Sequence, residues 1–332
     1  MSIKFLCGFE HQSRADSGFT ALINDNAVSD TSTPAQSKGN RSLRHFSSVL
    51  GIYTAPLSGN VQECYVGSMV RGDSAASDML AGISLGTTDR YVEAGFINGQ
   101  WVIYINGSSV ATVGGFSITD WHRLHLHVSG LSALDVVTLY KDGDLTAPLL
   151  SHTLTSGEVA GWPASFSHVC FVGQSQGYID DLWVMDPTDS TGTIDPQETL
   201  SFSVELLSPD ADGSDFTFAT GSFADVDEIP FDLADKITAD AVGQIADLSL
   251  TAATAAQVVG AMKITLRTQR SGTTAGSQIE LSLDDNTSNN VITTTTVPGD
   301  GMIEAYTETS ADGTRIEVSK INLSTIQGKT VT

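Results

Sequence analysis

The sequence predicts an all-β protein built from two consecutive domains. Short apolar runs alternate with polar residues at a period of two along most of the chain. Gly, Asn, Asp and Ser separate these runs, as they do between strands. No long segment has the 3.6-residue period of an amphipathic helix. A chain of 332 residues is long for one such domain and suits two.

The clearest strand of the first half is the segment 121–128. Its apolar face is expected to carry Leu124, Leu126 and Val128, and its polar face Arg123, His125 and His127. Asn106-Gly107 and Asp142-Gly143 follow apolar runs and predict tight hairpin turns. The expected strands of this half are 4–10, 63–71, 91–97, 101–105, 121–128, 136–141, 169–172 and 178–185. So many short strands at this spacing are typical of a sandwich or barrel.

The segment 188–199 is rich in polar residues and Gly and predicts a linker. We therefore expect a β-sandwich over 1–187, a linker over 188–199 and a second β-rich domain over 200–332. The strands expected in the second domain are 202–207, 262–268, 278–283 and 315–321, with the Thr-rich run 293–296 also read as strand. The alanine-rich segment 239–261 is compatible with one short helix or with short strands and loops.

The charge and composition exclude several classes of function. The formal net charge is −23, and the acidic residues are spread over both halves. Nucleic acid is therefore not an expected partner, because phosphate binding needs positive charge. No stretch approaches the roughly 20 apolar residues of a membrane helix. The first ten residues lack a charged leader before a long apolar run, so no secretory signal is expected.

The three cysteines predict buried thiols. Cys7, Cys64 and Cys170 are far apart, form no CxxC pair and lie in apolar, strand-like runs. Neither a disulfide framework nor a zinc site follows from this spacing. This use of cysteine fits synthesis in a reducing cytoplasm.

Three segments of the first half stand out: Trp121-His122-Arg123-Leu124-His125, Leu139-Tyr140-Lys141-Asp142-Gly143 and Tyr178-Ile179-Asp180-Asp181-Leu182-Trp183-Val184. They resemble segments of the concanavalin A-like lectin/glucanase sandwich, in its laminin-G-like branch. They occur in the order found in that fold. The resemblance implies a jelly-roll sandwich over about residues 1–187.

A narrower resemblance is to a family of tailed-bacteriophage virion proteins, in which a lectin-like domain precedes a second β domain. It is carried by the opening Phe5-Leu6-Cys7-Gly8-Phe9-Glu10 and by the segments 204–213, Gly221-Ser222 and Val226-Asp227-Glu228. Phe216 stands where that family usually has Trp. The resemblance implies a structural protein of the virion surface, either a head decoration or spike or a tail fibre or appendage. Such a protein assembles in the bacterial cytoplasm and binds other virion proteins as a homo-oligomer, with a trimer as our expectation.

No catalytic pattern is apparent. The E-x-D-x-x-E motif of the glucanase relatives is absent. Asp180 and Asp181 are neighbours on one strand and should point to opposite faces, so we expect one to tie down a loop and the other to be exposed. Calcium ligation and catalysis are the alternatives for this pair. We expect no enzyme activity.

Two other groups of residues are possible metal ligands. His125 and His127 share a strand face and could reach one metal, although an exposed polar face is the expected reading. The segment Pro209-Asp210-Ala211-Asp212-Gly213-Ser214-Asp215 has carboxylates at alternate positions, as calcium loops do. A turn capped by aspartates is favoured there over bound calcium. We expect no cofactor.

Glycan contact is the alternative function, because loop aromatics can stack on sugar rings. Trp101 heads a strand and is expected in the core, whereas Trp162 lies in the turn-rich sequence Gly161-Trp162-Pro163. The sequence thus favours a virion structural protein, with a lectin-like module that recognises a host-surface glycan through Trp162 as the alternative.

Overall fold

The chain folds into two compact units, Met1–Leu206 and Leu207–Thr332. The computed structural model describes residues 2–8, 19–23, 27–30, 42–45, 50–74, 77–84, 91–114, 117–189, 207, 209–225, 236–252, 261–269, 277–285, 287–297, 300–321 and 324–331. Most of the expected linker, from residue 190 to 199, lies outside these ranges, and so does most of the expected strand 202–207. The linker and that strand therefore stay predictions.

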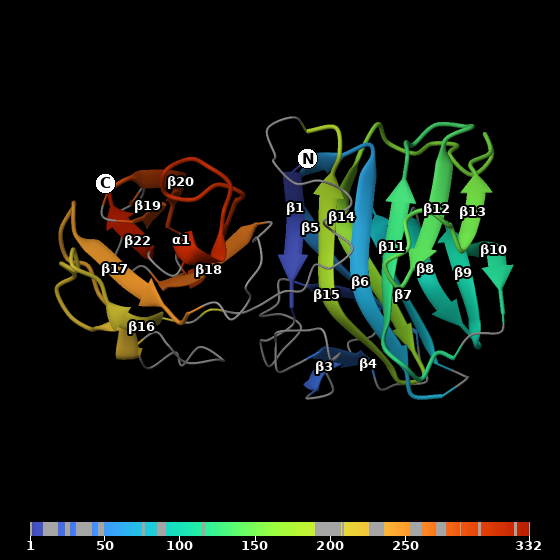
Figure 1. Ribbon diagram of the computed structural model, residues 1–332, viewed down its shortest axis with the longest axis horizontal. Coiled ribbons are helices and arrows are strands. Elements are labelled where there is room, and N and C mark those ends of the chain that lie inside the picture. Colours follow the sequence, from blue (N-terminus) through green and yellow to red (C-terminus); the bar gives the residue numbers. More distant parts are fainter. Residues whose placement is uncertain are drawn as a thin grey trace. The chain divides into compact units, whose positions relative to one another are not determined.

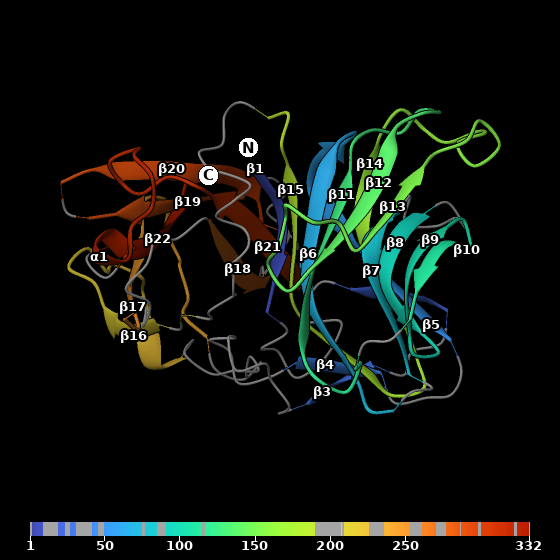
Figure 2. The ribbon, with the colours of Figure 1, turned by 45° about the vertical axis from the view of Figure 1, so that its right-hand side comes forward.

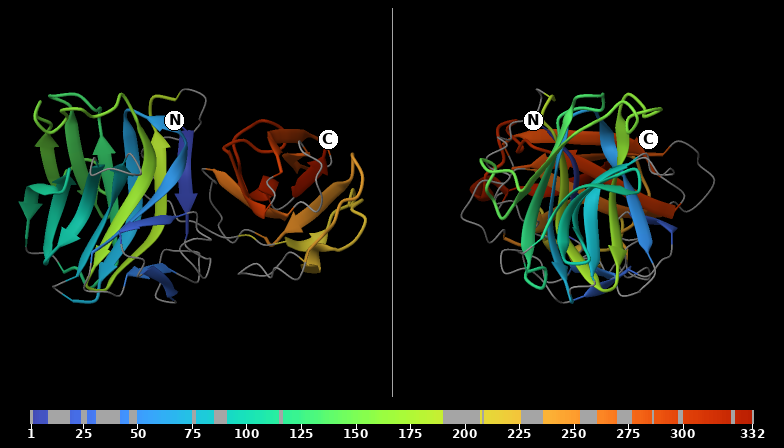
Figure 3. Two further views of the ribbon diagram at one scale, coloured as in Figure 1. Left: turned by 180° about the vertical axis from the view of Figure 1, so that it is seen from behind. Right: turned by 90° about the vertical axis from the view of Figure 1, so that its right-hand side faces the viewer.

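Unit 1 is a sandwich of two antiparallel sheets (Figures 1 and 2). The first sheet has eight strands, in the order β13 (Leu150–Thr153), β12 (Val136–Lys141), β11 (His122–Val128), β6 (Cys64–Gly72), β15 (Gly177–Asp186), β4 (Ser42–His45) and β3 (Ala27–Asp30), with β1 (Ser2–Cys7) also paired to β15. The second sheet has seven, in the order β10 (Ser108–Val113), β9 (Gln100–Ile105), β8 (Tyr91–Ile97), β7 (Asp78–Ser84), β14 (Phe166–Gln174), β5 (Gly51–Val61) and β2 (Thr20–Ile23). The two layers are seen from further directions in Figure 3.

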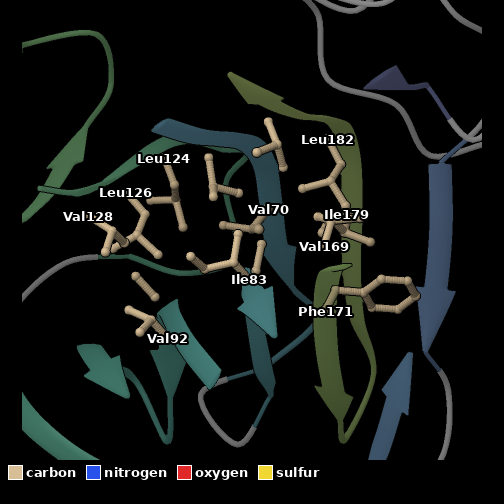
Figure 4. Packing of buried hydrophobic residues seen from close by; sticks show 14 of the residues in the cluster. Val70, Ile83, Val92, Leu124, Leu126, Val128, Val169, Phe171, Ile179 and Leu182 are labelled. Atoms are coloured by element: carbon tan, nitrogen blue, oxygen red, sulfur yellow. The ribbon is translucent and has the colours of Figure 1, made fainter. Parts of the chain in front are cut away.

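Alternation along each strand builds the core between the two sheets. Figure 4 shows side chains of both sheets meeting there. The labelled side chains of the eight-stranded sheet are Val70, Leu124, Leu126, Val128, Ile179 and Leu182, and those of the seven-stranded sheet are Ile83, Val92, Val169 and Phe171. Trp101 is fully buried in this core, as predicted. The three segments that resemble the lectin/glucanase sandwich form β11, β12 and β15, all in the eight-stranded sheet.

Most of the expected strands of unit 1 are confirmed. The segments 91–97 and 136–141 match β8 and β12 residue for residue, and 169–172 is the centre of β14. Asn106-Gly107 forms a two-residue hairpin turn between β9 and β10, with positive φ at both residues. Asp142 and Gly143 also have positive φ, but they begin a longer connection from β12 to β13. The sequence did not indicate β2, β3, β4, β5, β7, β10 or β13.

Unit 2 is a smaller antiparallel sandwich. Its five-stranded sheet has the order β16 (Pro209–Asp212), β17 (Ile245–Leu250), β22 (Thr325–Thr330), β19 (Gln278–Asp284) and β20 (Asn289–Thr296), and β18 (Met262–Gln269) pairs with β21 (Asp300–Thr307) in a second sheet. Apolar side chains of both sheets form one core, including Ile264 from β18, Leu281 from β19 and Ile303 from β21. The described residues contain only two short helical turns, η2 (Phe223–Asp225) and α1 (Val318–Ile321).

The segments 315–321 and 239–261 of unit 2 test two predictions from the sequence. The strand expected at 315–321 is wrong, because the chain there leaves a tight turn, in which Ser310 donates its N–H to Thr314, and then forms α1. The Lys320 ammonium, 2.7 Å from Asp312 Oδ2, ties α1 to that turn. In the segment 239–261, the described residues include β17 and no helix.

No helix among the described residues has the length and apolar character needed to cross a membrane.

Candidate functional site

The Asp180–Asp181 pair lies at an irregularity in β15. The pairing register between β15 and β6 shifts between Asp180 and Trp183, and Asp181 has a φ of 48°. Both side chains are buried, with 0% and 1% exposure. The expectation that one would be exposed is therefore wrong, because the bulge breaks the strict alternation of the strand. Asp180 Oδ1 accepts the N–H of Asp181 at 2.8 Å, a local contact that fixes the bulge.

The histidine face of β11 is also more enclosed than expected. His125 is fully buried, with its ring centroid 5.5 Å from that of Trp183. His127 stacks on Tyr65 at 4.2 Å, and its Nε2 is 3.1 Å from Glu63 Oε1. The reading of an exposed polar face is therefore wrong for His125. Across the described ranges, no three His, Cys, Asp or Glu side chains lie close enough together to hold a metal.

A buried acid on the other sheet was not indicated by the sequence. Glu93 of β8 and Cys170 of β14 are both register partners of Gly82 on β7, which lies between them. Because Gly82 has no side chain, the Cys170 thiol reaches across it and donates to Glu93 Oε1 at 3.3 Å. Both side chains are almost completely buried, and burial raises the pKa of Glu93 to about 8 and that of Cys170 well above its usual value. Glu93 is therefore a neutral acid at pH 7.

The three cysteines are buried, as predicted. Burial, with the nearby Asp186 and Glu63 carboxylates, raises the pKa of the Cys64 thiol. Thiolate is the reactive form of cysteine, so the raised pKa values make Cys64 and Cys170 poor nucleophiles.

Trp162 lies between the β9–β10 turn and the start of β14. Its ring is partly buried and packs edge-on against Phe166, with the centroids 5.3 Å apart. Its Nε1–H donates to Asn106 Oδ1 at 3.2 Å. Its backbone N–H donates to Val159 O, which closes a turn that includes Gly161 at a φ of 73°. Trp162 is thus held in a single orientation by two loops.

Polar side chains fix the loops around this ring. The Asn106 amide donates to Glu158 O at 2.7 Å while its oxygen accepts from Trp162. Glu158 in turn accepts from Thr155 and lies 3.0 Å from His152 Nε2. Desolvation would raise the pKa of Glu158, but the hydrogen bonds from Thr155 and His152 outweigh it and lower that pKa. We call Asn106, His152, Thr155, Glu158 and Trp162 the Trp162 cluster.

The Trp162 cluster combines an aromatic ring with an amide, a carboxylate and an imidazole that are only partly buried. Four of its members come from one segment, 152–162, and Asn106 comes from the β9–β10 turn about 50 residues earlier. The sequence identified Trp162 alone. Asn106 was recognised as a turn residue, and no local signal could show that its side chain also clamps the later loop.

The Asp-rich segment of unit 2 forms β16 and the turn after it. Asp210 and Asp212 are exposed, and Asp212 Oδ1 accepts the N–H of Phe223 at 2.7 Å. The N–H of Asp215 donates to the carboxylate of Asp247. Asp247 lies in β17, and the sequence pattern did not indicate it as a site residue. The turn after β16 is thus held by Asp247, through the N–H groups of Gly213 and Asp215, whereas Asp212 contacts the start of η2.

Comparison with known proteins shows similarity in fold alone. No known protein family matches the chain, and neither does any curated protein. Among solved structures, a sialidase aligns with a TM-score of 0.41 and 9% identity over 57% of this chain, which spans only 19% of that protein. A carbohydrate-binding module from Bacillus subtilis aligns with a TM-score of 0.35 and 10% identity, over 50% of this chain and 93% of that one. A glycosyl hydrolase family protein from Mycobacterium fortuitum aligns with a TM-score of 0.37 and 10% identity, over 56% of this chain and 100% of that one.

Lectins are among the similar structures as well, including peanut lectin at a TM-score of 0.35 and 12% identity, over 55% of this chain and 97% of that one. Enzymes and binding proteins thus occur side by side, so these likenesses do not separate catalysis from binding. The chain is an all-β protein, and its first unit is a sandwich of two antiparallel sheets.

Proposed function

We propose that unit 1 is a carbohydrate-binding module and that the Trp162 cluster is its contact surface. The observation that carries the proposal is the immobilised Trp162 ring surrounded by fixed polar groups. Sugars present an apolar ring face and a rim of hydroxyls, so an aromatic surface with amide, carboxylate and imidazole groups beside it is chemically complementary. Because Asn106 and Val159 already hold the ring, little conformational entropy is lost on binding.

Binding without cleavage is the reading we favour. Glycoside hydrolysis needs two carboxyl groups facing each other across the scissile bond. The buried acid of the seven-stranded sheet, Glu93, instead has the Cys170 thiol as its hydrogen-bond partner. In the Trp162 cluster, Glu158 is engaged by Thr155 and His152.

Trp162→Ala is expected to weaken glycan binding at least tenfold, because stacking on the ring is lost. Binding is measured by screening the full chain on an array of bacterial polysaccharides and titrating each positive by calorimetry. Trp121→Ala is the matched control, since Trp121 is another partly buried tryptophan of unit 1 that packs near Tyr178, outside the cluster. Equal loss in both variants, or undiminished binding by Trp162→Ala, contradicts the assignment of the site.

The role as a virion surface protein is a second proposal, which rests on the sequence resemblance alone. It includes homo-oligomeric assembly and contact with other capsid or tail proteins, and it is compatible with glycan recognition. Cryo-electron microscopy of particles from the source that encodes the chain is expected to show both units on the head or tail. Complete particles that lack the chain contradict this role and leave a free glycan-binding protein.

A further inference from the structure

Unit 2 contains a buried carboxyl group with an unsatisfied oxygen. Asp247 lies in β17, between β16 and β22, and is 1% exposed. Its Oδ2 accepts the N–H of Asp215 at 2.9 Å, but its Oδ1 has no hydrogen-bond partner among the residues that the structure describes. A buried carboxylate oxygen without a partner costs several kcal/mol, so such an atom calls for an unseen water, proton or ion.

The carboxyl group is directed at the acidic turn that follows β16. The N–H of Gly213 donates to Asp247 O at 2.7 Å, and a Cβ added at Gly213 would lie 2.1 Å from Asp247 Oδ2. Glycine is thus required at position 213 because the turn presses directly onto the carboxyl group. Asp215, whose N–H makes the bond to Oδ2, is exposed.

The surroundings supply oxygen atoms and negative charge. Gln327 of β22 is the register partner of Asp247, so both side chains lie on the same face of the sheet. This is the face opposite the unit's apolar core, because the adjacent Leu248–Ile326 pair lies on the core side. No Lys or Arg occurs between Pro209 and Asp225, whereas Asp210, Asp212 and Asp215 do.

We infer that Asp247 and the Gly213–Asp215 turn bind a calcium ion, with Asp247 Oδ1 as the anchoring ligand. Calcium takes oxygen ligands in flexible geometry, including carboxylates, amide and main-chain carbonyls and water. Further side chains with suitable oxygens are Asp215, which follows Gly213 in the turn, and Gln327, whose Oε1 also accepts from Asn289 Nδ2 at 3.3 Å. The described residues contain no cluster of three acidic or imidazole side chains, so water and main-chain oxygens complete the shell and the affinity is low. A dissociation constant of roughly 0.1–1 mM, as in extracellular modules, is expected.

Calcium is expected to stabilise unit 2 selectively. All four tryptophans, at positions 101, 121, 162 and 183, lie in unit 1, so tryptophan fluorescence reports the melting of unit 1. The full chain, stripped with EDTA, is heated in a calorimeter with and without 10 mM calcium chloride. The melting temperature of unit 2, which is the transition that tryptophan fluorescence does not report, should rise by about 5 °C, because the ion binds only the folded turn.

Asp247→Asn tests the anchoring ligand. Asparagine keeps an acceptor for the Asp215 N–H but loses the charge, so the calcium response should disappear while stability in EDTA is unchanged or higher. Asp240→Asn is the matched control: Asp240 is an exposed carboxylate of the same unit, bonded to Gln244, and its variant should keep the full response. If Asp247→Asn does not fold, Asp215→Asn at the exposed position should weaken calcium binding about tenfold by calorimetric titration.

Three results overturn the inference. They are a wild-type transition that 10 mM calcium does not move, an Asp247→Asn variant that responds as the wild type does, and an equal response to 20 mM sodium chloride.

Discussion

Glu93→Gln is expected to make unit 1 markedly more stable at pH 8–9 and to change it little at pH 4. Burial raises the pKa of Glu93 in the folded protein from its ordinary value of 4.5 to about 8. Below pH 4.5 the acid is neutral in both states, and the wild type keeps the full stability of the protonated, hydrogen-bonded group. Between pH 4.5 and 8 the unfolded chain ionises while the folded protein does not, so stability is lost as the pH rises.

The size of this effect is large for one side chain. At about 1.4 kcal/mol for each unit of pKa, the shift corresponds to about 5 kcal/mol of lost folding free energy by pH 8. Glutamine keeps the shape and an acceptor for the Cys170 thiol but cannot ionise. The variant should therefore lack this pH dependence. The free energy of unfolding of both proteins is measured at pH 4, 6, 8 and 9 by guanidinium unfolding, followed by tryptophan fluorescence.

Glu158→Gln provides a control of opposite sign. The pKa of Glu158 is lowered in the folded protein, so its carboxylate contributes stability that is present above the unfolded pKa and lost as the pH falls through the folded one. Its replacement should therefore destabilise unit 1 modestly at neutral pH and have no effect in acid. If wild type and Glu93→Gln lose stability in parallel from pH 5 to 9, Glu93 is not a buried neutral acid.

Gly67→Ala is expected to destabilise unit 1 by about 3 kcal/mol through overpacking. Gly67 of β6 is the register partner of Trp183 of β15, and the indole ring lies over it. A Cβ added at Gly67 would come within 2.0 Å of Trp183 Cε2. Trp183 is itself buried and packed near His125, so the ring has little freedom to move aside.

A double-mutant cycle with Trp183→Leu isolates this contact. In the background without the indole ring, Gly67→Ala should cost far less, giving a coupling energy of about 2 kcal/mol. Gly114→Ala is the matched control, because a Cβ there meets no atom of the described residues within 4 Å. Its effect should stay within about 0.5 kcal/mol. The free energies of unfolding are measured by guanidinium unfolding monitored by circular dichroism. If Gly67→Ala lowers this free energy equally with and without Trp183, the proposed overlap is contradicted.

The local pattern of the sequence determined the strands with the clearest alternation. The segments 101–105 and 136–141 end at Asn106-Gly107 and Asp142-Gly143, so both the strands and the turns that follow them could be predicted. Strands such as β5 and β7 are buried on both faces over several residues. They show no period of two and were missed. Buried thiols and a core position for Trp101 followed from the same apolar runs.

Local sequence patterns could not predict contacts between residues far apart in the chain. Alternation assigned Asp180 and Asp181 to opposite faces, but the bulge in β15 depends on pairing with β6, more than 100 residues earlier. The Glu93–Cys170 contact needs Gly82 between them, and the Trp162 ring needs Asn106 from another turn. The sequence by itself determined the all-β class and the residue types available. The tertiary structure alone decided which side chains meet, because register and strand order bring together residues that no local period connects.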